Sequence, residues 1–185
     1  MKPIKLIILS LFCGAICFGQ QAGTWNYSTT PEGAKRLTAH AIASTPSGSR
    51  ECSVKFSKGL GKKSTYTIIF CVKNVKDIKD FHFDDFDGPD AEVAGKPMKI
   101  DFVSVDKSYG FNFLPAGNYT VQPENGFEFS SYWLGKDNDL FKLVEKISTT
   151  SGKLHISISD SKDPKCTISA EFSIPKGEGG FKKIL

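Results

Sequence analysis

The chain has 185 residues, 24 of them lysine or arginine and 20 aspartate or glutamate, which gives a formal net charge of +4. That charge is too small for the basic surface of a nucleic-acid-binding protein. The length suits one domain that buries most of its surface on folding.

The first residues of the chain indicate export. Lys2 and Lys5 precede an apolar run at positions 6–18. A short basic end followed by an apolar run of this length is typical of a secretory signal peptide and is too short for a transmembrane anchor. We therefore predict a signal peptide at residues 1–19. A single β-rich domain at 20–185, periplasmic or extracellular and without a membrane span, follows it.

Two other interpretations of this start are less favoured. A buried N-terminal helix would need a polar face, which the apolar run lacks. Lipidation would need a small residue before the acceptor cysteine, whereas Ile16 precedes Cys17 and Phe12 precedes Cys13. Cleavage removes two lysines and no acid, which leaves 22 basic against 20 acidic residues.

Two strands are expected at the start of the exported domain. Thr24–Ser28 places Trp25 and Tyr27 on one face, as alternation with a period of two requires. Leu37–Ala43 alternates in the same way, although its alanines keep a helix open as the competing interpretation.

A hairpin at Glu51–Val72 is the clearest structural pattern in the sequence. Its first half alternates apolar and polar residues, and its second half, Thr65–Val72, is apolar on both faces like a central strand. Glycines and lysines at Lys58–Lys63 suit the turn between them.

The cysteines of this hairpin allow two registers. In the first, Cys52 lies opposite Cys71, about 4.5 Å away at Cα, which a disulfide accepts. In the second, Cys52 lies opposite Phe70, and Cys71 points to the other face. We favour the first register and its disulfide, because an exported protein occupies an oxidising compartment. Whether Cys166 is bridged stays open; the first register makes it a buried free thiol.

An acidic turn follows a phenylalanine-rich segment. Its carboxylates could contact a basic partner or calcium, a cation that prefers several oxygen ligands. The complete EF-hand spacing is absent, so the turn predicts no definite metal site, and a solvated acidic turn is the plain alternative. Its acids are Asp84, Asp85, Asp87 and Asp90.

The second half of the chain repeats short aromatic and aliphatic strand patterns around one helix. Together with the hairpin they predict a mainly β chain, an antiparallel β-sandwich or barrel-like domain with one short helix. A Gly- and Lys-rich tail, Pro175–Leu185, is expected to be loose. The expected strands are Met98–Val105, Tyr109–Phe113, Tyr119–Val121, Phe127–Leu134, Leu154–Ser159 and Cys166–Ile174, and the expected helix is Leu140–Ile147.

Few residues suggest chemistry. Tyr132 and Trp133 are adjacent, so a strand would turn one of them outward, where an exposed aromatic ring can anchor a sugar or a protein. Catalysis by His40, His82 or His155 would need a carboxylate or serine brought close by the fold, and no local motif provides one. Surface or hydrogen-bonded strand histidines are the simpler interpretation.

The order of these features resembles that of small secreted bacterial β-rich proteins of unknown function. The features are the opening Trp25-x-Tyr27, the cysteine-bearing hairpin, the acidic turn, the helix at Asp139–Lys146 and the closing alternating strand. The resemblance spans most of the exported domain and implies no catalytic residues.

The sequence therefore favours an exported, non-enzymatic binding protein that acts on another protein, of the inhibitor or immunity kind. Such proteins block an enzyme by inserting a loop, and Asp84–Asp90 and Lys58–Lys63 are the candidate loops. The first alternative is a ligand-binding or cell-envelope module that binds a glycan or calcium. The second is a hydrolase. The oligomeric state and the identity of the partner stay open.

Overall fold

A computed structural model gives the structure of the chain. It describes residues 24–60, 65–75, 78–79, 81–82, 98–113, 118–121, 126–134, 139–160, 162–176 and 179–185, without the side chains of 112–134 and 179. The predicted signal peptide (1–19) and the acidic turn (Asp84–Asp90) lie outside the described residues.

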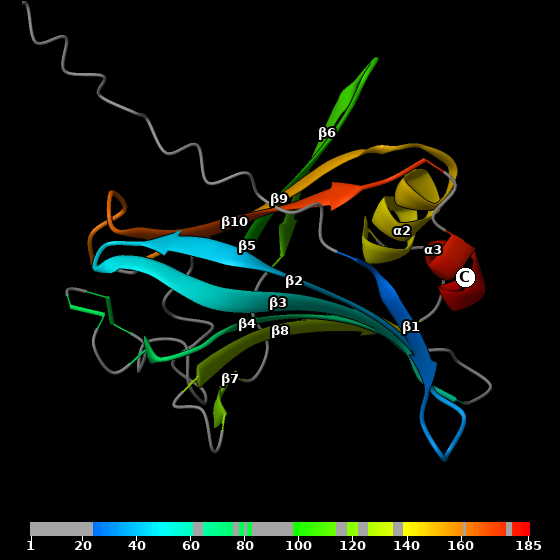
Figure 1. The fold of residues 1–185 in the computed structure, drawn as a ribbon, viewed down its shortest axis with the longest axis horizontal. Coiled ribbons are helices and arrows are strands. Elements are labelled where there is room, and N and C mark those ends of the chain that lie inside the picture. The colour runs from blue at the N-terminus through cyan, green and yellow to red at the C-terminus, as the bar shows by residue number, and fades with distance from the viewer. Residues whose placement is uncertain are drawn as a thin grey trace, which may run out of the picture.

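The described strands form one antiparallel sheet in the order β6-β5-β9-β10-β2-β3-β4-β8-β7, with β1 added beside β2 (Figure 1). The prediction of a mainly β, antiparallel, barrel-like chain is confirmed. The strands are β1 (Asn26–Thr29), β2 (Lys35–Thr45), β3 (Gly48–Lys58), β4 (Thr65–Val72), β5 (Met98–Ser104), β6 (Ser108–Phe113), β7 (Asn118–Val121), β8 (Gly126–Leu134), β9 (Gly152–Ser159) and β10 (Thr167–Ile174).

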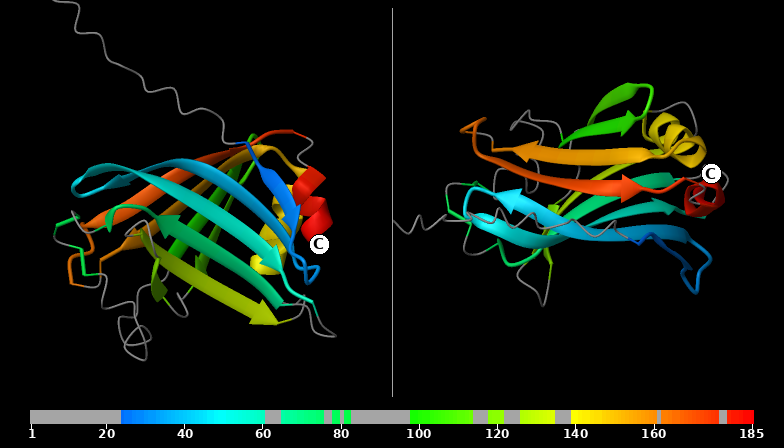
Figure 2. Two further views of the ribbon diagram at one scale, coloured as in Figure 1. Left: turned by 60° about the horizontal axis from the view of Figure 1, so that its bottom comes forward. Right: turned by 45° about the horizontal axis from the view of Figure 1, so that its top comes forward.

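The sheet curls into two facing layers. The junction of the layers is short, because β10 pairs with β2 through Ser169–Ser44 and Ala170–Ala43 alone. In Figure 2, β9 and β10 lie over β2 and β3, and the two helices close one end. Side chains that point into the curl form one apolar core, and side chains on the outside meet water.

Strict alternation explains why these segments become strands. In β9, Leu154, Ile156 and Ile158 are buried, while the residues between them are half-buried or exposed. β10 repeats the pattern from Ile168 to Ile174. Each large aliphatic side chain that leaves water stabilises the fold by roughly 2 kcal/mol. A period of two therefore commits each strand to one inward face.

The predicted register of the β3–β4 hairpin was wrong. Cys52 lies opposite Val72, and Cys71 lies opposite Ser53 on the other face, so the predicted Cys52–Cys71 disulfide was wrong as well. No disulfide joins the cysteines of the described residues. Burial dominates here, because this register sends Phe70 and its alternate neighbours into the core. A shift of the register by one residue, which would place Cys52 opposite Cys71, would turn Phe70 and its alternate neighbours outward.

The predicted helix is confirmed as α2 (Asp139–Thr149). Its apolar residues follow the 3.6-residue period and bury one face against the concave side of the sheet. Phe141 contacts Tyr66 of β4, with ring centroids 5.5 Å apart. Its buried residues are Leu140, Leu143, Val144 and Ile147.

The expectation of a loose tail was wrong, because the tail forms a second helix, α3 (Gly179–Ile184). Phe181 is fully buried, 4.8 Å from the ring of Trp25 and 5.4 Å from the ring of Phe56. The Trp25 indole N–H donates a 2.8 Å hydrogen bond to the carbonyl of Ser173. Phe181 and Ile184 are three residues apart, so one short helix can bury both.

Candidate functional site

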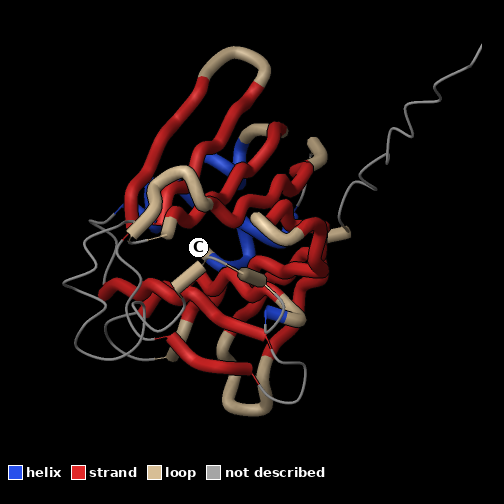
Figure 3. Tube along the Cα trace, turned by 90° about the vertical axis from the view of Figure 1, so that its left-hand side faces the viewer, coloured by secondary structure: helices blue, strands red, loops and turns tan. Residues whose placement is uncertain are grey.

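The β5–β6 hairpin is the best candidate for contact with a partner. Its tip stands clear of the neighbouring strands (Figures 1 and 3). The turn is well held, because Ser104 N donates to the carbonyl of Lys107 at 2.9 Å, and Lys107 N donates to the Ser104 hydroxyl at 3.1 Å. The hairpin is therefore an ordered projection.

Two valines are exposed at this tip. Val105 is 90% exposed and Val103 is 45% exposed. Large aliphatic residues on a surface are common singly, but two on one ordered turn form a small apolar contact. Ile42 and Leu60, the other large exposed aliphatic residues of the described part, lie on β2 and beyond the end of β3.

Two lysines of the described part surround the ring of Tyr109 on the inner face of this hairpin. The Nζ atoms of Lys107 and Lys146 lie 5.4 Å and 5.9 Å from the ring centroid of Tyr109. That ring stacks on Phe102, with a centroid distance of 6.2 Å and planes 16° apart. Neither lysine forms an ion pair with an acid of the described residues. The hairpin therefore carries exposed valines and one exposed acid, Asp106, and two lysines without an ion pair in the described residues lie at its Tyr109 ring.

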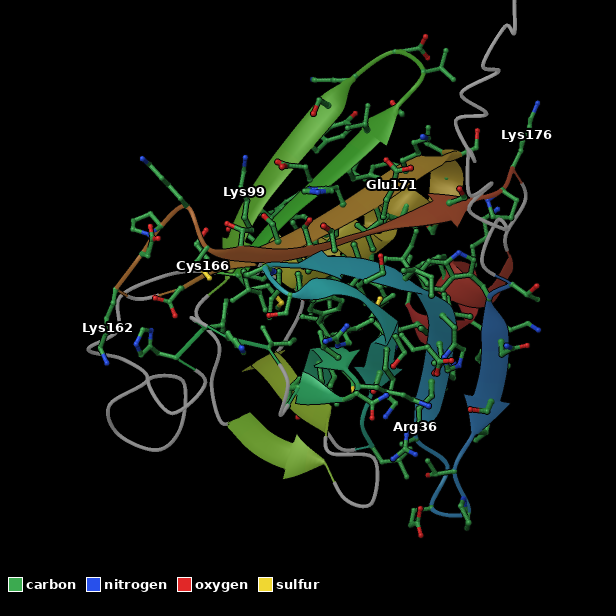
Figure 4. The ribbon with its side chains drawn as sticks, turned by 60° about the vertical axis from the view of Figure 1, so that its left-hand side comes forward. Arg36, Lys99, Lys162, Cys166, Glu171 and Lys176 are labelled. Atoms are coloured by element: carbon green, nitrogen blue, oxygen red, sulfur yellow. The ribbon has the colours of Figure 1, made fainter. Side chains whose placement is uncertain are left out.

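A row of charged side chains crosses the outer face next to the hairpin. In the strand register, Asp101 of β5 lies opposite His155 of β9, and His155 lies opposite Glu171 of β10. Lys99 forms a 3.2 Å ion pair with Asp101, and Lys153 forms a 2.8 Å ion pair with Glu171. Figure 4 shows Lys99 near the base of the hairpin and Glu171 on β10.

This row does not resemble a metal centre. Within the described residues, no three histidine, cysteine or acidic side chains are placed to hold a metal ion. Exposed ion pairs of this kind contribute about 0–1 kcal/mol to stability. The row gives the outer face a mixed, balanced charge.

His82 and Asp160 form a polar contact in which the carboxylate is fully buried. The His82 Nδ1 atom lies 3.0 Å and 3.1 Å from the two carboxylate oxygens of Asp160. The carboxylate also accepts hydrogen bonds from the backbone N–H groups of His82, Lys162 and Asp163, at 2.6–2.8 Å. Asp160 is fully buried. One side chain thus ties the segment at 81–82 to the β9–β10 turn.

The surroundings of Asp160 determine its protonation. Burial by itself raises the pKa of the carboxyl, but hydrogen bonds from the backbones of His82, Asp163 and Lys162 and from the His82 ring outweigh it. The pKa of Asp160 falls from 3.8 to about 2. Asp160 is therefore ionised at neutral pH, where its charge is held by N–H donors.

The histidines do not assemble a nucleophilic site within the described residues. The His82 ring has hydrogen bonds to Asp160 alone, so no described hydroxyl or thiol donates to it, as a serine or cysteine nucleophile would. His40 is exposed on β2, and His155 lies in the charged row. Burial raises the pKa of the Cys52 thiol to about 12, which keeps it protonated.

The other predicted site residues are placed only in part. The acids Asp84, Asp85, Asp87 and Asp90 lie outside the described residues. Tyr132 and Trp133 lie in β8, opposite Thr67 and Tyr66, but their side chains lie outside the described part.

The lysine-rich turn of the β3–β4 hairpin is described at its first residues. Lys58 donates to the carbonyl of Leu185, and its Nζ lies 5.5 Å from the ring centroid of Tyr66. It is therefore engaged in the fold, and positions 61–64 of the turn lie outside the described residues.

The sequence did not predict that Lys107 and Lys146 would meet at the ring of Tyr109. The alternation of Tyr109 and Phe111 predicted a strand correctly, but nothing local indicated that β6 would lie at the edge of the sheet. Lys146 comes from α2, 37 positions beyond Tyr109, and only the tertiary fold brings the two together.

Comparisons with known proteins give no relative: no protein-family model, no curated protein and no solved structure matches this chain. Among the helices of the described residues, neither is long and apolar enough to span a bilayer.

Proposed function

We propose that this chain is an exported, non-enzymatic binding protein that acts on another protein, and that the β5–β6 hairpin makes the contact. The observation that carries the proposal is the ordered tip, where Val103 and Val105 are exposed on the hairpin that also carries Lys107. Protein interfaces have an apolar centre surrounded by a polar rim. This tip has both parts already in place.

The charge of the tip indicates the kind of partner surface that fits it. Lys107 and Lys146 concentrate two positive charges around one aromatic ring, against one exposed acid at the turn, Asp106, and neither lysine forms an ion pair with an acid of the described residues. An acidic surface would gain from both charges and would also be steered toward the tip. The proposed partner therefore presents acidic side chains around an apolar depression that accepts Val105.

Two further features support binding over hydrolysis. The Asp160 carboxylate that faces His82 also accepts two N–H groups of its own turn, which is the bonding of a structural tie. The basic and apolar start of the sequence supports an exported location, where inhibitor and immunity proteins meet their targets.

A photo-crosslinking residue at Val105 in the full chain tests the proposal in the cells that produce it. We expect one discrete protein adduct from position 105 and none from a matched probe at His40, which is exposed on β2. The captured protein is then purified, and its affinity for the wild-type chain is measured directly.

Matched substitutions make that measurement decisive. Val105→Asp should weaken binding at least about tenfold, because it places a charge in an apolar contact and opposes an acidic partner. Ile42→Asp, at an aliphatic residue that is 49% exposed on β2, should leave affinity unchanged. Equal affinities for wild type and Val105→Asp would contradict the proposal.

A further inference from the structure

We infer that the open edge of β6 binds an extended segment of the partner by strand addition. That segment alternates apolar and polar residues and carries an acidic residue where it meets Lys107 and Lys146. This inference rests on the proposed function, and it adds the mode of binding and the chemistry of the bound segment.

The hydrogen-bond pattern of the hairpin leaves backbone groups facing outward. Ser104 and Lys107 form a hydrogen-bonded pair at the turn. Such pairs alternate along an antiparallel ladder, so Tyr109 and Phe111 are bonded to β5. The N–H and C=O groups of Ser108 and Gly110 therefore point away from β5. No described strand pairs with this edge.

The position of Gly110 fits this alternation. In a pair without hydrogen bonds the two Cα atoms come closest, about 4.5 Å apart. Gly110 lies opposite Asp101, and a Cβ atom at Gly110 would come within 3.1 Å of an Asp101 carboxylate oxygen. A mid-strand glycine also leaves room for another backbone to approach the edge.

The two faces of β6 specify the pattern of an incoming strand. Tyr109 and Phe111 face the core and are only partly buried, while Ser108 and Gly110 are exposed on the outer face. An added strand would continue this arrangement, with apolar side chains covering the two rings and polar side chains outside. The bound segment must therefore alternate with a period of two.

Charge favours a foreign segment over a second copy of this chain. β6 reads Ser-Tyr-Gly-Phe-Asn-Phe and contains no acid, so a second β6 would bring no carboxylate to Lys107 and Lys146. It also contains neither proline nor a charged residue, the usual protections of a strand edge. An edge that no described strand covers, with Lys107 and Lys146 beside it, fits an extended partner segment that carries an acidic residue.

Selection from a random peptide library displayed on phage tests this inference with the full chain. We expect enriched peptides to alternate apolar and polar residues with an acidic residue at one end. Hydrogen exchange should slow at least about tenfold at the Ser108 and Gly110 amides when a synthetic copy of an enriched peptide binds. Failure to enrich any peptide, or protection elsewhere alone, would overturn the inference.

A backbone substitution isolates strand addition from other contacts. Gly110→Pro removes an outward N–H that β5 does not use, and edge strands tolerate proline at such positions. Affinity for the enriched peptide should fall at least tenfold, whereas Gly110→Ala, which keeps the N–H, should bind like wild type. Thermal melting confirms that both variants fold. Equal binding by a folded Gly110→Pro variant overturns the inference.

A charge-matched pair tests the acidic residue. The double variant Lys107→Glu/Lys146→Glu should abolish peptide binding. The double variant Lys165→Glu/Lys182→Glu makes the same change of charge at exposed positions outside the β5–β6 hairpin and α2, and it should bind like wild type. A dimer of the wild-type chain that Gly110→Pro dissociates in sedimentation would overturn the inference in favour of self-pairing.

The same variants separate this inference from the proposed function. If the protein captured at Val105 still binds Gly110→Pro at full affinity, the proposed function stands and strand addition fails. If no protein is captured at Val105, the proposed function fails by itself, whatever the peptides show.

Discussion

The carboxylate of Asp160 holds together segments that are 78 positions apart in the sequence. It accepts three backbone N–H groups and faces the ring of His82. We predict that Asp160→Ala destabilises the protein by about 3 kcal/mol, because it leaves three backbone N–H donors and the His82 ring without their acceptor. Asp163→Ala removes an exposed carboxylate bonded to one N–H, and it should cost about 1 kcal/mol or less. Urea unfolding measures both, and equal losses would contradict the prediction.

The depressed pKa of Asp160 predicts a loss of stability in acid. A carboxyl whose pKa is lower in the folded state adds stability above its unfolded pKa, near 3.8. That stability disappears as the pH falls through the folded pKa of about 2. The wild type should therefore lose stability between about pH 4 and pH 2 relative to Asp160→Asn, which has no carboxyl to titrate there. Urea midpoints measured from pH 6 to pH 2 check this, and parallel curves would refute it.

The sequence could not predict the role of these two residues. A turn follows Asp160 in the structure, where the Cys166 N–H donates to the carbonyl of Asp163. Nothing local links that turn to His82, for which the sequence favours a surface or hydrogen-bonded strand histidine. Contacts between residues so far apart depend on how the strands are ordered, and a hydrophobic pattern does not encode that order directly.

Strand patterns in the β3–β4 hairpin were predicted well, and its register was not. Cys52 alternates with apolar residues on β3 as expected, but β4 is apolar on both faces, so either face could turn inward. A presumed disulfide decided between the registers, and the burial of Phe70 opposite Val54 overrides it. Pairing geometry is weakly specified wherever a strand is apolar on both faces.

α3 is the element whose removal should cost most for its length. Phe181 is fully buried between Trp25 and Phe56. We predict that Phe181→Ala destabilises the protein by about 3–5 kcal/mol through the cavity it leaves. Lys182→Ala, at the exposed position next to it, should change stability by less than about 0.5 kcal/mol. Denaturant unfolding compares the two, and a negligible effect of Phe181→Ala would show that the tail does not dock.

The composition of the tail hid this helix. Lysine and glycine dominate residues 175–185 and indicate a loose end. The contrary signal was the spacing of Phe181 and Ile184, which puts two large apolar side chains on one helical face. Two apolar residues in a six-residue segment are too weak a signal to outweigh the glycines and lysines around them. The helix could be recognised only once the core that buries Phe181 and Ile184 was known.

For the molecule as a whole, the sequence predicted fold class but not strand order. Ten short strands with turn signals between them were sufficient for a mainly β, barrel-like chain. The position of β6 as an outer strand, and with it the candidate binding edge, depends on which strands pair over long distances. Alternation states only that each strand has an inner face, so the binding edge could not be found before the topology was known.

The two layers of the curled sheet should unfold as one unit, although they are joined by only two residue pairs between β2 and β10. Cooperativity here comes from the core, because one continuous cluster of buried residues includes side chains from both layers. Trp25 connects them, with its ring 6.1 Å from Phe56 of β3 and 6.3 Å from Phe172 of β10.

We therefore predict a single transition in urea, with the same midpoint by tryptophan fluorescence and by far-UV circular dichroism. Trp133→Phe leaves Trp25 as the sole tryptophan of the chain, so its fluorescence reports contact between the layers alone. If the short junction governed unfolding instead, Trp25 would lose its signal at a lower urea concentration than the strands lose theirs. Separate midpoints would show two layers that melt independently, and a hairpin on one layer would then be a weaker platform for a partner than one held by the whole core.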